Sequence, residues 1–149
     1  RGEPAVEAVE LEGIGEARPT PEVERALAEA ELIVIGPSNP VISIGPILAV
    51  PGMRAAISAS GVPVVAVSPY VAGEVVKGPT ERFMRAVGRP SSAAGVASLY
   101  EGLLDAMLVD EGDPDDPPRG LRIRAARTLM SDRESRLAVA QATLELAAP

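Results

Sequence analysis

Three short apolar runs constrain the fold of this chain more than any other feature of its sequence. They are Leu32 to Ile35, Val64 to Val67 and Ala106 to Val109, and none of them contains a polar side chain. A strand with one wet face alternates apolar and polar residues, whereas a strand covered on both faces of a parallel sheet is apolar throughout. A buried helix gives a similar run, but short runs with β-branched residues favour strands. The sequence therefore predicts a mostly parallel sheet with helices on both faces.

Segments with helical periodicity alternate with these runs. Residues 21 to 30 have apolar side chains three and four positions apart, with Thr20 placed as the cap and Pro21 at the first helical position. Further helices are predicted at residues 51 to 60, 80 to 87 and 92 to 104, and a fourth strand at residues 121 to 126. Ser131 and Glu134 have the spacing of a capping box, which predicts the start of the last helix. The shared apolar face of that helix is predicted to contain Leu137, Ala140 and Leu144.

The lengths of the connections place a candidate site. The links that lead into strands are short, whereas the links that leave strands are long and span residues 36 to 50, 68 to 79 and 110 to 120. In a parallel sheet every link that leaves a strand emerges at the carboxyl edge, where open α/β sheets bind their ligands. We therefore expect the three long connectors to meet at one edge and to form a ligand site there.

Composition excludes several classes of function. The 149 residues have a formal net charge of −7, which argues against a nucleic-acid surface or an anionic membrane surface. Because the chain has no Cys and no His, disulfide frameworks, thiol nucleophiles, imidazole bases and the usual zinc sites are excluded. A bound metal would be a hard cation on oxygen ligands, such as magnesium. No signal-peptide pattern is present, so a cytoplasmic location is expected.

The longest uncharged run covers 22 residues, from Leu32 to Met53. Its length would suffice to cross a bilayer, but it contains Pro37, Pro40, Pro46 and Pro51. Each proline removes a backbone donor and obstructs a helical turn, and hydrocarbon cannot satisfy the groups that are freed. The segment after the first strand is therefore predicted to be a rigid, uncharged loop rather than a membrane span.

This first connector has the residue types of an anion site. Ser38, Asn39 and Ser43 offer side-chain hydrogen bonds, and Gly36 and Gly45 let a ligand approach the backbone. Exposed N–H groups near a helix start can hold an anion without a basic residue. The alternative is a turn-rich connector in which Ser and Asn only cap their own backbone.

The second and third connectors carry charged candidates. Lys77 is the only lysine among 14 basic residues, and beside Gly78 it is suited to contact phosphate; the alternative is a solvated lysine, with Glu74 as its ion-pair partner. Residues 111 to 120 form an acidic, Pro-rich loop, most of which is expected to be solvated. Asp110 and Glu111, nearest the strand, are the better candidates for binding magnesium or a ribose hydroxyl, and the metal ligands stay undetermined.

Three long motifs resemble a known family. They are GPSNPVISIGPILAVPGMRAAI, PVVAVSPYVAGEVVKGPTERFM and AGVASLYEGLLDAMLVDEGD, and they occur in the order expected of the family, whose resemblance covers nearly the whole chain. They resemble the carboxyl-terminal half of the 2-phospho-L-lactate transferases of coenzyme F-420 biosynthesis, including the branch that uses phosphoenolpyruvate. The resemblance implies that residues 1 to 149 are the carboxyl-terminal portion of one Rossmann-like, three-layer α/β domain, and hence a partial domain.

The resemblance also implies a reaction. A phosphoenolpyruvyl or 2-phospho-L-lactyl group passes from a guanosine-diphosphate-activated donor to the deazaflavin 7,8-didemethyl-8-hydroxy-5-deazariboflavin, and GMP is released. Magnesium as cofactor, a homodimer, and no nucleic-acid or membrane partner are expected. By the same resemblance, Lys77 and Gly78 contact phosphate, with Lys77 as the catalytic candidate. The implied nucleotide and substrate site contains Ser38, Asn39, Pro40, Ser43, Gly45 and Ser68.

The chain also departs from that family. Family members open with a strand and a glycine-rich turn that are absent here, so the amino-terminal half of the same protein is an expected partner. Arg127 stands where the family tends to have an acidic residue, so no role passes to this position. Two alternatives stay open: a nucleotide-sugar-binding regulatory protein of a sister family, and a non-catalytic structural or dimerisation half.

Overall fold

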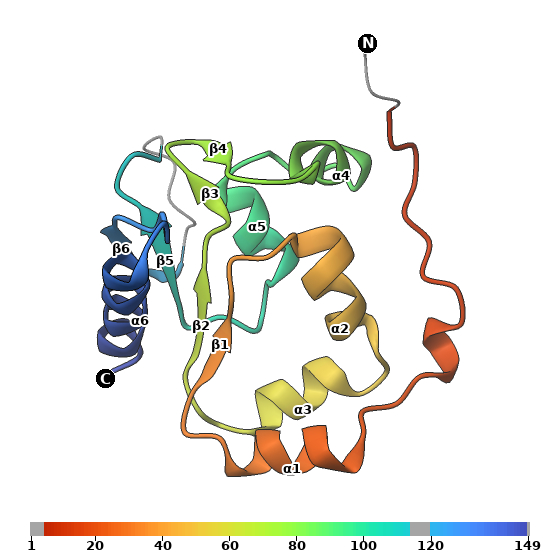
Figure 1. Cartoon of the computed structure of the whole chain (residues 1–149). Coiled ribbons are helices and arrows are strands. Elements are labelled where there is room, and N and C mark those ends of the chain that lie inside the picture. Colours follow the sequence, from red (N-terminus) through yellow and green to blue (C-terminus); the bar gives the residue numbers. More distant parts are fainter. Residues whose placement is uncertain (1–4, 114–119, 149) are drawn as a thin grey trace.

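The computed structural model describes residues 5–113 and 120–148, and it has a parallel sheet at its centre (Figure 1). The sheet order is β1-β2-β5-β6, and all three neighbouring pairs are parallel. Its strands are β1 (Ile33–Ile35), β2 (Val64–Val67), β5 (Ala106–Asp110) and β6 (Arg122–Ala126). The predicted α/β fold with a mostly parallel sheet is confirmed, and the three apolar runs are its first three strands. The predicted fourth strand is also present.

Side chains of β2 alternate between two apolar layers. Val64 and Ala66 face the larger core cluster, whereas Val65 and Val67 face the clusters that contain residues of α6 (Arg133–Ala147). All four are buried, which explains why the strand reads as a continuous apolar run.

The other helices lie on the opposite side of the sheet from α6 (Figure 1). They are α1 (Pro21–Glu29), α2 (Gly45–Ala49), α3 (Met53–Ala59), α4 (Thr80–Ala86) and α5 (Ala93–Leu99), preceded by the 3-10 turn η1 (Ile14–Glu16). Met84, Val96 and Met107 are fully buried between these helices and the sheet. Thr20 caps α1 as predicted, but no residue of α1 is buried, so its apolar face packs only partly.

The first connector differs from its prediction. Instead of a loop from residue 36 to 50, it contains the π-helical turn η2 (Pro40–Ile44) followed directly by α2. Asn39 accepts hydrogen bonds from the backbone N–H groups of Val41 and Ile42 at 3.0 Å, which satisfies donors at the start of the turn. Pro40 lies at the start of η2, where a missing N–H costs nothing, so the proline that signals a loop here begins a helical segment.

The second connector contains a short hairpin that the sequence did not predict. Its strands are β3 (Tyr70–Val71) and β4 (Glu74–Val75), paired antiparallel. The turn between them places both Ala72 and Gly73 at positive φ, 51° and 79°. The helix predicted at residues 92 to 104 is also shorter, because α5 ends at Leu99 and Gly102 has a left-handed φ of 77°.

The last helix is present, but its cap and its packing face were predicted wrongly. Asp132, not Ser131, is the cap, and it forms a capping box with Ser135. The residues that pack against the sheet include Val139 and Ala142. Leu137 and Leu144, predicted on the packing face, are 60% and 62% exposed.

Within the described ranges, no single helix is both long enough and apolar enough to cross a membrane. Pro40–Ala49 and Met53–Ala59 reach that length and composition only as a pair, with a bend of 80° between them. Leu48 and Ile57 of this pair are buried in the main core.

Candidate functional site at the carboxyl edge

The connectors gather at the carboxyl edge, which is the rim of the sheet where β1, β2, β5 and β6 end. In Figure 1 this rim is at the top, where the β3–β4 hairpin and α4 lie above the sheet. The predicted meeting of the long connectors at one edge is therefore confirmed for the described residues. Side-chain hydrogen bonds hold these connectors in place.

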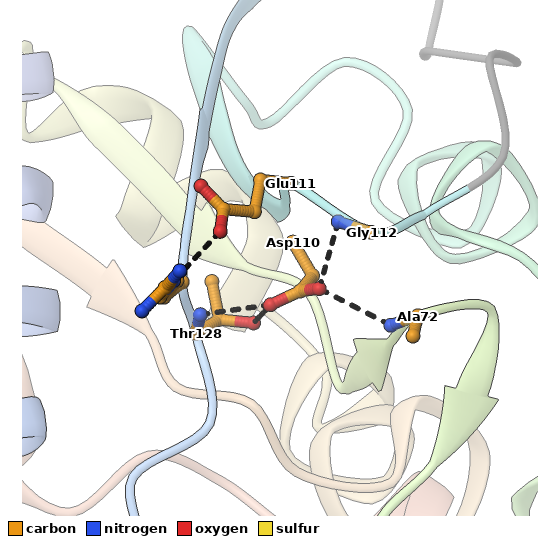
Figure 2. Close-up of polar contacts among 6 residues, drawn as sticks. Ala72, Asp110, Glu111, Gly112 and Thr128 are labelled. Atoms are coloured by element: carbon orange, nitrogen blue, oxygen red, sulfur yellow. Dashed lines mark hydrogen bonds and ion pairs between the residues drawn. The ribbon is translucent and has the colours of Figure 1, made fainter.

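Asp110, the last residue of β5, joins three segments of the rim through its carboxylate (Figure 2). Oδ1 accepts hydrogen bonds from the backbone N–H groups of Ala72 at 3.2 Å and Gly112 at 2.9 Å. Oδ2 accepts from the backbone N–H of Thr128 at 2.9 Å and from its hydroxyl at 3.0 Å. One buried side chain thus fixes the β3–β4 turn, the start of the acidic loop and the segment after β6.

A second carboxylate strengthens the same junction. Asp113 accepts a hydrogen bond from the backbone N–H of Gly73 at 2.9 Å, so the two turn residues of the hairpin are held by the end of β5 and by the acidic loop. Asp115 and Asp116 of that loop lie outside the described residues.

Hydrogen bonding keeps Asp110 ionised. Burial alone would raise the pKa of this carboxyl, but the donors of Thr128, Gly112 and Ala72 outweigh burial and leave the pKa below its ordinary value of 3.8. Because each oxygen already accepts two hydrogen bonds, the carboxylate has little capacity left for a ligand. The expectation that Asp110 binds magnesium or a ribose hydroxyl is not supported by this geometry, and its role is to position loops.

Glu111 is engaged differently. Its carboxylate, labelled near Asp110 in Figure 2, forms a salt bridge of 2.8 Å with Arg127. Both side chains are more than half exposed, so the pair contributes little to stability. Glu111 raises the pKa of Arg127 through this hydrogen bond.

Among the described residues, no three or more Asp and Glu side chains are placed together to hold a metal ion. Of the two candidates for a hard cation, Asp110 is saturated by backbone and hydroxyl donors and Glu111 pairs with Arg127. Magnesium remains a prediction for the whole enzyme, and no step is assigned to it.

A second tie joins the first connector to α4. The side-chain amide of Asn39 donates to the hydroxyl of Thr80 at 3.1 Å, and Thr80 is 3% exposed. Because the oxygen of Asn39 caps η2 at the same time, one N–H of its amide is left for a ligand. Lys77 lies three residues before Thr80, so the tie brings the two predicted phosphate-binding segments to the same part of the rim.

The other predicted residues of the first connector divide into exposed and structural positions. Ser38 and Ser43 are exposed and available to a ligand, whereas Pro40 is buried. A Cβ on Gly45 would lie 3.1 Å from the carbonyl oxygen of Pro40, so glycine permits the close turn between η2 and α2. This packing role is separate from the predicted approach of a ligand.

The second connector presents its cation freely. Lys77 is exposed, and among the described residues neither Lys77 nor Glu74 takes part in a salt bridge, so the pair suggested from the sequence does not form. Gly78 has a φ of 85°, a left-handed conformation that favours glycine. Ser68 is 1% exposed, and its hydroxyl accepts from the backbone N–H of Tyr70 at 3.1 Å.

Sequence reasoning missed Thr80 and Thr128 as parts of this rim. Both are buried polar residues whose hydroxyl groups bond to side chains 41 and 18 positions away in the chain. The sequence predicts Thr80 only as the start of a helix and gives Thr128 no role. Thr80 is the first residue of α4 and Thr128 follows the end of β6 by two residues, so their places near the carboxyl edge were a signal, but the sequence does not show which side chains they contact.

Comparisons with known proteins agree with the motifs. A family model for the 2-phospho-L-lactate transferase CofD matches residues 1–142. The chain is 46% identical over 146 residues to a phosphoenolpyruvate transferase from Streptomyces coelicolor, covering 95% of this chain and 46% of that protein. It is 46% identical over 140 residues to a phosphoenolpyruvate transferase from Streptomyces griseus subsp. griseus, covering 91% and 44%.

An archaeal relative matches over a similar length. A 2-phospho-L-lactate transferase from Methanopyrus kandleri is 39% identical over 148 residues, covering 97% of this chain and 47% of that protein. The chain thus spans slightly under half the length of these curated relatives. Among solved structures, protein BH3568 from Bacillus halodurans has a TM-score of 0.56 at 23% identity over 85% of this chain and 47% of that chain, which shows a likeness in fold.

Proposed function

The chain belongs to the 2-phospho-L-lactate transferase CofD family, and from this premise we propose that it supplies the phosphate-binding rim of a transferase. In this proposal the donor is a guanosine-diphosphate-activated phosphoenolpyruvate or 2-phospho-L-lactate, and the acceptor is the deazaflavin 7,8-didemethyl-8-hydroxy-5-deazariboflavin. Complete activity requires the portion of the relatives that this chain does not match. The homodimer and the cytoplasmic location remain predictions.

The observation that carries the proposal is the Asn39–Thr80 hydrogen bond, which brings the first connector to the residue that follows Lys77, Gly78 and Pro79. A diphosphate bound there would meet the exposed hydroxyls of Ser38 and Ser43 on one side and Lys77 on the other. Open α/β sheets bind phosphorylated ligands at this edge. The names of the relatives, which are phosphoenolpyruvate and 2-phospho-L-lactate transferases, support the choice of the transferred group.

The proposed chemistry needs alignment and charge neutralisation more than a covalent nucleophile. A ribityl hydroxyl oxygen of the acceptor attacks the phosphorus of the phosphoenolpyruvyl or 2-phospho-L-lactyl group. A new P–O bond forms, the P–O bond to GMP breaks, and GMP leaves with the electron pair while the hydroxyl proton is released. Lys77 would offset negative charge on the transferred and leaving groups, as a compact, mobile cation can.

The test is the Lys77→Ala variant of the complete protein. We expect transfer to fall by more than about tenfold, since a charge-assisted contact to phosphate is lost. Arg25→Ala, which removes an exposed cation on α1 at a distance from the rim, serves as the control and is expected to keep full activity. Wild-type turnover in Lys77→Ala would remove Lys77 from the site.

Binding of GDP, followed by calorimetry, separates this proposal from a purely structural role. We expect both Lys77→Ala and Asn39→Ala to weaken binding of GDP to the complete protein. Binding that is unchanged in both variants would favour the alternative in which this chain is a structural or dimerisation half.

A further inference from the structure

Two buried polar atoms near the rim have no hydrogen-bond partner among the described residues. They are the hydroxyl oxygen of Tyr70 and Oδ2 of Asp113. Tyr70 belongs to β3 and has no exposed surface, although its phenol can donate a hydrogen bond. Buried polar groups are normally hydrogen-bonded, so each exception calls for an explanation. Here one of the two groups is a donor and the other is an acceptor.

The segments that carry these two groups are in contact. Asp113 holds the turn of the β3–β4 hairpin through Oδ1, which accepts from the backbone N–H of Gly73 at 2.9 Å. One position earlier, a Cβ on Gly112 would lie 3.2 Å from the Cβ of Ala72, so the acidic loop and the hairpin turn touch. Tyr70 lies in the first strand of the same hairpin. Donor and acceptor therefore belong to two segments that already pack against each other.

The ionisation of Tyr70 indicates which polar groups surround its hydroxyl. Burial raises the pKa of Tyr70 above its ordinary value of 10.0, the hydroxyl of Ser91 lowers the pKa, and the negative charges of Glu81 and Asp113 raise it. Glu81 and Ser91 are exposed residues that water can reach. Asp113 differs from both, because it offers a buried acceptor atom that still lacks a donor.

We propose that Tyr70 and Asp113 form a buried latch, in which the Tyr70 hydroxyl donates across one shared water molecule to Oδ2 of Asp113. A buried water joins polar groups that would otherwise be unpaired, and it needs at least two polar partners. The Tyr70–Asp113 latch satisfies the second oxygen of Asp113, whose first oxygen holds Gly73. Both oxygens of this carboxylate then fasten the hairpin to the acidic loop.

The latch makes Tyr70 and Asp113 positioning residues for Lys77. β4 ends two residues before Lys77, so the hairpin sets the place from which that side chain extends. At the far end of the same connector, Thr80 is held by its hydrogen bond to the first connector. This consequence rests on the proposed function of Lys77, whereas the latch itself does not.

Thermal unfolding of the wild type, Tyr70→Phe, Asp113→Ala and the double variant tests the latch. Tyr70→Phe should lower the melting temperature by at least about 3 °C, because the partners of the lost hydroxyl stay buried and unpaired. In the Asp113→Ala background the same change should shift the melting temperature by less than about 1 °C. A hydroxyl without a partner predicts the opposite sign, since phenylalanine would then remove a buried unsatisfied group.

Two controls separate the latch from other causes. Tyr100→Phe changes the other tyrosine, which follows α5, and should have the same effect with Asp113 as with Ala at that position. Ser91→Ala tests the competing partner of the hydroxyl. If Ser91→Ala, and not Asp113→Ala, cancels the effect of Tyr70→Phe, the hydroxyl bonds to Ser91 and the latch is rejected.

Titration of Tyr70 is a second measurement, which uses a more conservative variant. In Tyr100→Phe the phenol of Tyr70 is the only one, and the chain has no Trp, so the ultraviolet absorbance of tyrosinate reports the pKa of Tyr70 alone. Asp113→Asn should lower this pKa by at least about one unit more than Glu81→Gln, because both remove a charge but only Asp113→Asn removes a hydrogen-bonded one.

Three results would overturn the latch: an unchanged or raised melting temperature in Tyr70→Phe, additive losses in the double variant, or equal shifts of the Tyr70 pKa in the two carboxylate variants. Transfer by the complete protein tests the consequence for Lys77. Tyr70→Phe should lower transfer by at least about twofold, with no further loss in the Lys77→Ala background. An equal further loss there would show that Tyr70 does not act through Lys77. Wild-type turnover in Lys77→Ala would instead reject the proposed function, and the melting temperatures would still decide the latch.

Discussion

At the scale of single residues, Asp110 shows how this rim tolerates a buried charge. A buried carboxylate is costly unless hydrogen bonds satisfy its oxygens, and here three N–H groups and one hydroxyl do so. An amide in its place would offer one acceptor atom instead of two. Its NH₂ group would then face donors, either those of Thr128 or those of Ala72 and Gly112.

We therefore expect Asp110→Asn to lower the free energy of unfolding by about 1–3 kcal/mol at neutral pH, the range for leaving buried polar groups unsatisfied. Urea denaturation measures the change. Asp113→Asn is the matched control, because its oxygen can still accept the single hydrogen bond from Gly73, so a smaller loss is expected. Equal losses in the two variants would contradict this account.

The lowered pKa of Asp110 predicts that the stability of the protein depends on pH. Because the pKa of Asp110 is lowered in the folded state, its contribution to stability is complete above its ordinary value of 3.8. That contribution is lost as the pH falls further, through the folded-state pKa. The wild type should therefore lose stability more steeply than Asp110→Asn between about pH 5 and about pH 2. Parallel stability profiles of the two proteins would show that Asp110 does not titrate as inferred.

At the scale of elements, strands were easier to predict than the segments between them. The strand Val64–Val67 was predicted with its observed bounds, because burial on both faces leaves a continuous apolar pattern. The connector after β1 was predicted as a loop, because prolines and glycines are typical of loops. Asn39 and Pro40 instead begin a helical turn, and only the cap geometry reveals this.

The predicted cap of the last helix is wrong for a related reason. The sequence Ser131-Asp132-Arg133-Glu134-Ser135 contains two overlapping capping patterns, and the more familiar one predicts Ser131 and Glu134 as the capping pair. In the structure Asp132 accepts from the backbone N–H of Ser135 at 2.8 Å, and its negative charge suits a helix start. The apolar residues Leu137 and Leu144 mislead for another reason: they form a face that this chain leaves exposed.

Asp132→Ala should accordingly lower the melting temperature of the chain by a few degrees, whereas Ser131→Ala should leave it nearly unchanged. Thermal unfolding followed by circular dichroism distinguishes the two caps. A larger effect of Ser131→Ala would restore the pairing predicted from the sequence. Asp132 is expected to be ionised while it caps the helix, since its hydrogen bonds with Ser135 hold its pKa below the ordinary value.

At the scale of the whole molecule, the sheet should be most stable at its centre. β2 and β5 have a strand on each side and helices over both faces, whereas β1 has one neighbour and a half-open face. Hydrogen exchange of the chain alone should therefore show its slowest amides in Val64–Val67 and Ala106–Asp110, with faster exchange in Ile33–Ile35. Uniform protection across the three strands would contradict the exposed edge.

The meeting of the connectors followed from topology, because parallel strands all end at one rim. The sequence also placed Asn39 and Lys77 on connectors that a hydrogen bond brings together. It did not show which side chains serve as anchors. Asp110 was expected to bind a ligand, and only its four donors, from segments 2 to 38 positions away, reveal its role.

Three of the four bonds to Asp110 come from main-chain amides, which every residue type except proline can supply. The anchor is therefore largely indifferent to the side chains that the connectors display. An engineer could exchange those side chains to alter the preferred substrate without dismantling the architecture that presents them. This freedom does not include proline at position 72, 112 or 128, nor a side chain at Gly112, whose Cβ would lie 3.1 Å from Oδ1 of Asp110.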